Sequence, residues 1–144
     1  MTAKELIQAN LDVVVGNAPD LTARFYARLF EQHPELQHLF GRRSAEAQQR
    51  MLLEAIAAVV DHLDDLPWLE QTLRALGAKH VAYGVTDAMY PMVAGALMDT
   101  LERASAEHWN DAVRDAWAAA LTFVADRMQA GARTADGMTA SAAE

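Results

Sequence analysis

The chain has 144 residues, of which 52% are hydrophobic, and this is enough for one domain with a hydrophobic core. Its formal net charge of −8 disfavours nucleic acid and anionic membranes as partners, because an acidic surface repels phosphate groups. The absence of cysteine excludes disulfides, thiolate nucleophiles and cysteine-based zinc or iron–sulfur sites. Because glycine and proline are sparse and β-branched runs are short, we expect an all-α domain.

Apolar residues recur at steps of three and four along most of the chain, which is the spacing of amphipathic helices. The expected helices cover residues 3–15, 19–33, 45–63, 68–80, 87–105 and 110–130, with a short turn-like segment at 34–40. Pro34, Pro67 and Gly84 separate these pieces, and the connections between them are short. This pattern favours crossed-helix packing over a simple four-helix bundle.

Residues 1–130 are expected to form a single domain. From Gly131 the chain is rich in small and polar residues without periodicity, so residues 131–144 are predicted to form a disordered C-terminal tail. No stretch approaches the ~18 continuous apolar residues of a membrane span, and no N-terminal segment resembles a secretion signal. We therefore expect a soluble cytoplasmic protein, either a monomer or a weak homodimer.

Four polar residues fall on helix faces that are otherwise apolar: Tyr26, Gln48, His80 and Tyr90. His80 takes the next place along a stripe of leucines that begins at Leu69. Each residue also has a purely structural explanation, as a core tyrosine whose hydroxyl reaches water, a solvated glutamine, or a hydrogen-bonded core histidine. A buried polar group without a partner costs roughly 1–3 kcal/mol. Four such groups in one small domain favour a polar group bound at its centre.

The usual metal and catalytic motifs are missing. The five histidines form no HxxxH or HxxH pair, and Glu35, Glu46 and Glu54 do not supply the two Glu-x-x-His motifs of a di-iron bundle, which disfavours a zinc or di-iron site. The sequence also lacks a G-x-S-x-G turn, a G-x-G-x-x-G motif and a phosphate-binding loop. One helical histidine facing a broad apolar pocket is what a haem iron requires, because the iron needs one axial nitrogen and the porphyrin needs an apolar slot.

Three segments resemble the globins: FYARLFEQHPELQHLF at 25–40, the spacing from Gln48 to Leu52, and LGAKHVAYGVTDAMYPMV at 76–93. Within that family the chain is similar to bacterial single-domain globins related to the haem domain of flavohaemoglobins, over about residues 3–130. The resemblance implies a globin fold, in which six to eight crossed helices enclose haem b (iron protoporphyrin IX).

The resemblance also implies roles for individual residues. On the proximal side, His80 would bind the iron through Nε2, Tyr90 would hydrogen-bond the imidazole, Lys79 would lie near a haem propionate, and Val93 would line the pocket. On the distal side, Tyr26 and Gln48 would face the ligand, Leu52 would cover the iron, and Phe40 would wedge the porphyrin.

These roles imply reversible binding of O2, and of NO or CO, for oxygen transport or storage. The alternative is a nitric oxide dioxygenase that uses a separate reductase, because the chain ends before any flavin or nicotinamide domain. In flavohaemoglobins a glutamate joins the proximal histidine and tyrosine, whereas the matching place here is near Ala132, which counts against peroxidase-like chemistry and high turnover. A third possibility is a haem-free helical interaction module, in which His80 would be a plain core residue.

Overall fold

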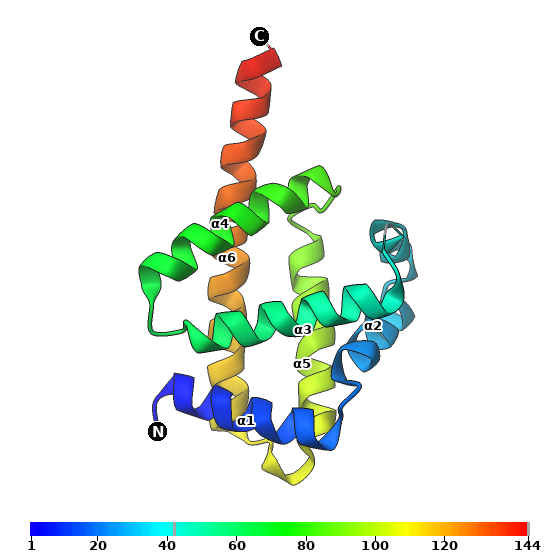
Figure 1. Ribbon diagram of the computed structural model, residues 1–144, viewed down its shortest axis with the longest axis vertical. Coiled ribbons are helices and arrows are strands. Elements are labelled where there is room, and N and C mark those ends of the chain that lie inside the picture. The colour runs from blue at the N-terminus through cyan, green and yellow to red at the C-terminus, as the bar shows by residue number, and fades with distance from the viewer. Residues whose placement is uncertain (42, 144) are drawn as a thin grey trace.

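The computed structural model describes the backbone of residues 1–41 and 43–143 and the side chains of residues 1–41 and 43–134. Within this part of the chain six α-helices and two short 3-10 helices follow one another, without a strand (Figure 1). They are α1 (Ala3–Asn17), α2 (Leu21–Gln32), η1 (Pro34–Phe40), α3 (Ala45–Asp61), α4 (Leu66–Ala82), α5 (Met89–Ser105), η2 (Ala106–His108) and α6 (Asp111–Ala143). The expected all-α fold of crossed helices is confirmed.

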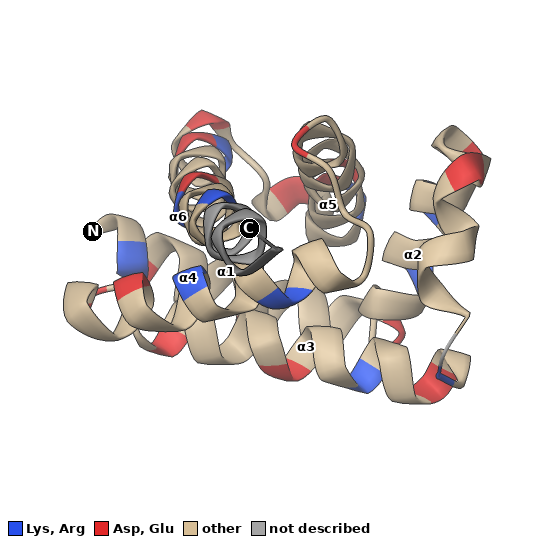
Figure 2. Ribbon diagram, turned by 90° about the horizontal axis from the view of Figure 1, so that it is seen from above, with Lys and Arg blue, Asp and Glu red and all other residues tan. Residues whose placement is uncertain are grey.

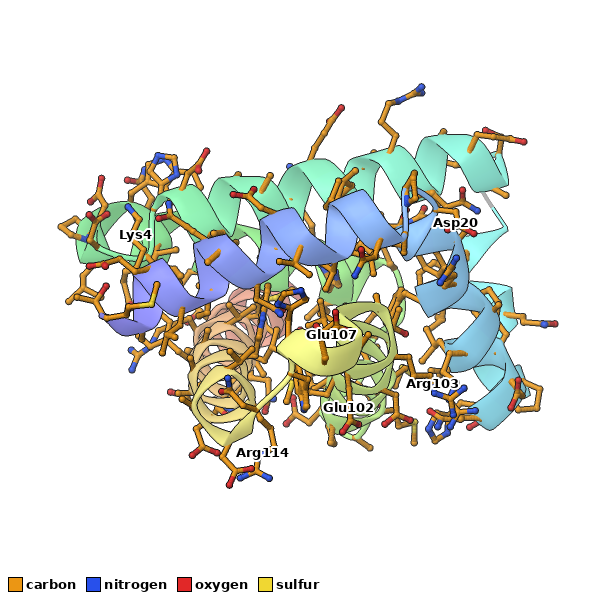
Figure 3. The ribbon with its side chains drawn as sticks, turned by 90° about the horizontal axis from the view of Figure 1, so that it is seen from below. Lys4, Asp20, Glu102, Arg103, Glu107 and Arg114 are labelled. Carbon is orange, nitrogen blue, oxygen red and sulfur yellow. The ribbon has the colours of Figure 1, made fainter. Side chains whose placement is uncertain are left out.

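The helices form two layers. Helices α5 and α6 run side by side, and α1, α3 and α4 cross them on one side (Figures 1 and 2). The main core lies where α1, α2, α5 and α6 meet, and Ile7, Leu21, Leu29 and Leu101 are among its fully buried side chains. Charged side chains such as Glu102, Glu107 and Arg114 lie on the outside (Figure 3). Among the described residues no helix is both long and apolar enough to cross a membrane.

Local sequence signals fix the starts of three helices that matter for the site. The side chains of Ser44, Asp65 and Asn110 accept hydrogen bonds from backbone N–H groups three residues later, at 3.2, 3.2 and 3.0 Å. Such caps stabilise a helix by about 1 kcal/mol each. They place the beginnings of α3 and α6 where the sequence indicated, whereas α4 begins at Leu66, two residues before the expected start.

Two expected helix starts were too early. Helix α2 begins at Leu21 because Pro19 belongs to a turn, closed by a 2.9 Å hydrogen bond from Leu21 N–H to the Ala18 carbonyl. Helix α5 begins at Met89, because residues 86–88 form a turn in which Met89 N–H donates to the Thr86 carbonyl at 3.1 Å. In both places the chain makes a tight turn before the helix, and the spacing of apolar residues does not indicate this turn.

A buried polar network ties α1 to α5 and α6. The Asn10 amide donates to Ser105 Oγ at 2.9 Å and accepts from Trp117 Nε1 at 2.9 Å. Ser105 Oγ in turn donates to the Leu101 carbonyl at 2.6 Å. Because each of these groups has a partner, the network holds three helices in register without leaving a polar atom unsatisfied.

Helices α4 and α6 touch through their backbones at two glycines. A Cβ atom on Gly77 would lie 2.7 Å from the Met128 Cα, and one on Gly131 would lie 2.6 Å from the Arg74 Cα. Real Cβ atoms do not approach backbone so closely, so both positions require glycine. These contacts give α4, which carries His80, a fixed position against α6.

The contact at Gly131 also corrects the expected start of the tail. Helix α6 continues past this residue, and Gly131 and Ala132 are buried against the rest of the domain. The prediction of disorder was based on small residues, and here small residues allow the close helix contact. Nothing is described for the side chains of residues 135–143 or for Glu144.

Candidate functional site

Helices α2 and α3 and the 3-10 helix η1 bring three of the expected site residues together. Gln48 Nε2 donates a hydrogen bond to the Tyr26 hydroxyl at 3.1 Å. The rings of Tyr26 and Phe40 meet edge to face, with their centroids 5.4 Å apart. Phe30 packs against both rings, at centroid distances of 5.9 and 5.5 Å. An amide and a phenol are thus held within an aromatic cluster.

The Tyr26 phenol stays protonated at neutral pH. Burial raises its pKa above the ordinary value of 10.0, and the hydrogen bond from Gln48 lowers it in part. Because Gln48 donates to the hydroxyl oxygen, the phenol O–H proton is not used in that bond and can be donated to another acceptor. The pair therefore presents a hydrogen-bond donor whose oxygen is held in place by the amide.

His80 lies near the end of α4 with its tautomer set by the backbone. Its Nδ1 is 2.7 Å from the carbonyl oxygen of Leu76, one turn earlier. A carbonyl can only accept, so Nδ1 carries a proton, and in the neutral imidazole it is then Nε2 that keeps the lone pair. This neutral form of imidazole is the one that binds a metal ion, and the backbone bond orients it as an outer partner does in known metal sites.

The hydrogen bond expected between Tyr90 and His80 is absent. The Tyr90 hydroxyl is buried and has no hydrogen-bond partner among the described residues, whereas Leu76 occupies the imidazole Nδ1. Burial raises the pKa of Tyr90, and the charge of nearby Asp87 raises it further. Tyr90 instead packs against a small cluster centred on Leu73 and Met128. The sequence did not predict the Leu76 carbonyl as the partner of His80, because every residue has a backbone carbonyl and the pattern of side chains does not distinguish one from another.

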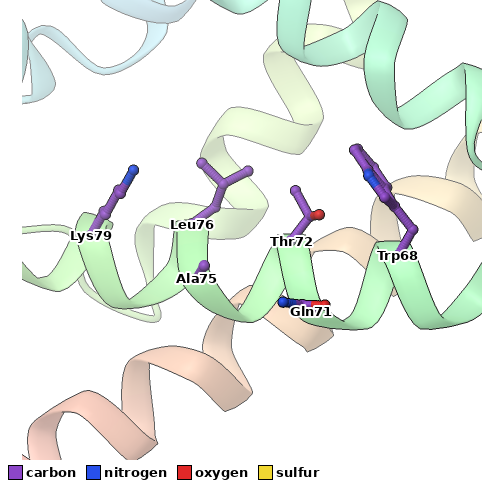
Figure 4. A pocket seen from close by; sticks show the side chains of 6 residues that line it. All are labelled: Trp68, Gln71, Thr72, Ala75, Leu76 and Lys79. Atoms are coloured by element: carbon purple, nitrogen blue, oxygen red, sulfur yellow. The ribbon is translucent and has the colours of Figure 1, made fainter.

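An open cavity of about 480 Å³ lies along the face of α4 that looks toward α3 (Figure 4). Trp68, Thr72, Leu76 and Lys79 point to this side, at successive turns of the helix. Trp68 also stacks on His62 at the end of α3, with ring centroids 3.7 Å apart, and so closes one end of the gap between the two helices. All the residues that line the cavity belong to α4: the apolar Trp68, Ala75 and Leu76, the polar Gln71 and Thr72, and the cation Lys79.

The apolar stripe of α3 is only half buried. Val60 is its single fully buried residue, while Leu52 and Ile56 remain partly exposed although they contact the core. Val93 of α5 is half buried in the same way. Partly open apolar side chains and a histidine whose Nδ1 is held by a backbone carbonyl are features that haem binding requires, so the residues present are compatible with haem.

A second open cavity, of about 410 Å³, lies between α5 and α6. Its lining includes Tyr90, Asp126 and Gln129. The structure places Asp126 at the same cavity as Tyr90, where it pairs with Arg127 at 3.4 Å. The buried Ala132 carries no carboxylate, so Tyr90 receives no acidic partner from that position.

The crossed helices, the helical histidine and the paired tyrosine and glutamine define a domain of the globin class. A family model described as globin matches residues 23–128. The chain therefore belongs to the globin family, and the resemblance stated from the sequence is confirmed.

Relatives and solved structures agree with this assignment. The chain is 31% identical to a flavohemoprotein of Vibrio cholerae and 34% identical to one of Bordetella pertussis, over 83% and 85% of its length. It spans 31% of the length of each of these relatives. Its fold is shared with a bacterial globin of Campylobacter jejuni, at a TM-score of 0.77 and 22% identity, covering 92% of this chain and 95% of that one. The fold is also shared with an engineered carbene transferase from Rhodothermus marinus, at a TM-score of 0.80 and 24% identity, covering 99% of this chain and 96% of that one.

Proposed function

We propose that this globin binds haem b, with His80 as the protein ligand of the iron, and that it binds O2 reversibly on the opposite face. The observation that carries the proposal is the hydrogen bond that His80 Nδ1 donates to the Leu76 carbonyl, which leaves Nε2 as the nitrogen available to a metal ion. When bound, haem supplies a ferrous iron that takes up diatomic gases, and CO and NO are further ligands of the same position.

The Tyr26–Gln48 pair supports O2 as the ligand. Bound O2 carries partial negative charge, so a hydrogen-bond donor beside it strengthens binding. Gln48 donates to the Tyr26 oxygen and leaves the phenol proton for the gas. Leu52, on the same side of α3 one turn after Gln48, is expected to exclude water, which strengthens this bond.

The neutral partner of His80 supports binding rather than catalysis. A carboxylate on Nδ1 would make the imidazole more basic and push electron density toward the iron, whereas the Leu76 carbonyl is an uncharged acceptor. Weak electron donation favours reversible O2 binding over cleavage of the O–O bond. We therefore propose oxygen storage, transport or scavenging as the use of this site.

Nitric oxide dioxygenation is the second candidate. It converts O2, NO and one electron into nitrate, and the names of the relatives favour it: several are flavohemoproteins, and the Rhodothermus marinus protein is named as a nitric oxide dioxygenase. The reaction needs an electron donor, and we propose a flavin-containing reductase as the partner that supplies the electron.

Absorption spectra of the purified protein after haem supplementation test the first proposal. We expect a Soret band and distinct ferric, deoxy and oxy spectra, and a colourless protein would overturn both candidates. His80→Ala should fold but lose its haem to an acceptor such as apomyoglobin, because the iron then has no protein nitrogen. Unchanged retention would show that another residue binds the iron. Repeated turnover of NO with a flavin reductase, beyond a single reaction of the oxy form, would favour the dioxygenase.

A further inference from the structure

Phe30 is an aromatic residue that contacts both Tyr26 and Phe40. It follows Tyr26 by four residues on α2, which places the two side chains on the same face of the helix. The centroid of its ring lies 5.9 Å from that of Tyr26 and 5.5 Å from that of Phe40. Because Phe40 belongs to η1, the three rings support one another across two elements of the fold.

The ring of Tyr26 has aromatic neighbours at different angles. Phe30 is inclined by 30° to the Tyr26 ring, and Phe40 meets that ring at 68°. Phe25 meets it at 63°, with a centroid distance of 5.0 Å. Closely packed rings at such different angles oppose rotation of the Tyr26 ring about its Cβ–Cγ bond. The plane of the phenol is therefore set by its aromatic neighbours.

This plane decides where the phenol proton points. The O–H bond of a phenol prefers the plane of its ring, because an oxygen lone pair conjugates with the ring, and so the proton has two favoured directions. Gln48 Nε2 donates to the Tyr26 oxygen at 3.1 Å, and its N–H disfavours the direction that points at the amide. If the Tyr26 ring were free to turn, its proton would no longer have one fixed direction.

We propose that Phe30 is a positioning residue, which holds the Tyr26 ring at the angle from which its phenol donates to bound O2, and that it thereby raises the preference of the site for O2 over CO. The proposal rests on the haem site proposed above. Bound O2 carries more negative charge than bound CO, so it gains more from a hydrogen bond. Phe30 has no hydrogen-bonding side-chain group and acts through Tyr26.

Phe30 is also the neighbour of Tyr26 that can be replaced at the smallest cost to the fold. Phe25 is 2% exposed and belongs to the core, so its loss would disturb the packing of several helices. Phe30 is only partly buried. We therefore expect Phe30→Leu to fold and to differ from the natural protein mainly in the missing ring.

A double-mutant cycle with Tyr26→Phe tests the proposal in the haem-loaded protein, with O2 and CO dissociation followed in stopped flow. Phe30→Leu should speed O2 dissociation about three-fold, roughly half of the ten-fold effect of Tyr26→Phe on a logarithmic scale, and CO dissociation should change less. In the Tyr26→Phe background, Phe30→Leu should have no further effect, because the phenol is already gone. An unchanged O2 rate, or an equal acceleration in both backgrounds, would overturn the proposal.

A second measurement does not involve oxygen. Nuclear magnetic resonance of ring-labelled tyrosine follows the titration of Tyr26 with and without haem, and Tyr26→Phe assigns its signal. Burial raises the pKa of Tyr26 above 10.0. Phe30→Leu admits water beside the phenol, so this pKa should move back toward the ordinary value while that of Tyr90 stays the same. An unaltered Tyr26 titration would show that Phe30 does not hold the phenol.

Phe123→Leu is the matched control. Phe123 is a partly buried aromatic residue of α6, and it packs against the cluster of Leu73 and Met128 instead of Tyr26. This variant should leave both O2 dissociation and the Tyr26 titration as they are, and the same changes in it would reduce the effect of Phe30 to general loosening. A protein without a Soret band would refute the haem site itself, and the Tyr26 titration would still decide whether Phe30 positions the phenol.

Discussion

Replacing Gly77 by alanine should destabilise the protein, although alanine is the better helix former. In the middle of a helix the change gains about 1 kcal/mol from propensity alone. At Gly77, however, the new Cβ would lie 2.5 Å from the Met128 carbonyl carbon and 2.7 Å from its Cα. Both atoms are backbone, so they cannot move aside as a flexible side chain can.

The expected magnitude follows from these opposing effects. Overpacking of a well-packed contact costs about 1–3 kcal/mol, and the rigid backbone places Gly77→Ala in the upper part of that range. After the gain in propensity is subtracted, we expect a net loss of about 1–2 kcal/mol. For a domain of this size that lowers the melting temperature by about 3–6 °C. Because Gly77 precedes His80 by one turn, the variant should also release haem faster.

Gly95→Ala is the matched control. Gly95 is an exposed residue in the middle of α5, and a Cβ there would have no atom within 4 Å. This variant should gain about 1 kcal/mol, so the two substitutions are expected to have opposite signs. Urea unfolding followed by circular dichroism, with and without haem, measures both. If Gly77→Ala proves as stable as Gly95→Ala, the close contact of α4 with α6 does not exist in solution.

Three further predictions concern other parts of the molecule. Tyr26→Phe should speed O2 dissociation about ten-fold in stopped flow, because a hydrogen bond of ~1.5 kcal/mol is lost, and an unchanged off-rate would exclude this phenol as the donor. Asn10→Ala should lower the free energy of unfolding by roughly 1–3 kcal/mol, since the Trp117 indole N–H loses its buried acceptor; wild-type stability would mean that water replaces the amide. Above pH 10.0 the stability should fall, because the raised pKa values keep Tyr26 and Tyr90 protonated in the folded state while the unfolded state loses these protons. A Tyr26→Phe/Tyr90→Phe variant should lose most of this alkaline slope, and an unaltered slope would assign it to other groups.

The features that the sequence predicts correctly are those with a local cause. Ser44 lies beside the apolar stripe that follows it, at the expected start of α3, and it caps that helix. The same holds for Tyr26 and Gln48, whose polarity on apolar helix faces indicates a common pocket, and they do form a hydrogen bond. At these positions the type of the residue and its spacing along the chain indicate its structural role.

The features that the sequence does not predict depend on where two backbones meet. Gly77 and Gly131 have no distinguishing pattern, and Gly131 even suggests a disordered tail, because a glycine that permits a close helix contact looks like one that breaks a helix. The hydrogen bond from His80 to the Leu76 carbonyl cannot be predicted from the sequence either, since every residue has a carbonyl. Only the three-dimensional arrangement separates these cases.

The two glycine contacts also explain why α4 can keep one side open. Gly77 and Gly131 hold α4 against α6 by its backbone, on the side away from α3, and the cavity lined by Leu76 and Lys79 occupies the other side. Side-chain packing between α3 and α4 is therefore not needed to position α4, and the apolar residues facing the gap remain available to a ligand. If this is correct, the haem-free Gly77→Ala protein should lose protection from hydrogen exchange in α4 more than in α2 or α5. Uniform loss of protection across the domain would mean that the contact with α6 does not specifically hold α4 in place.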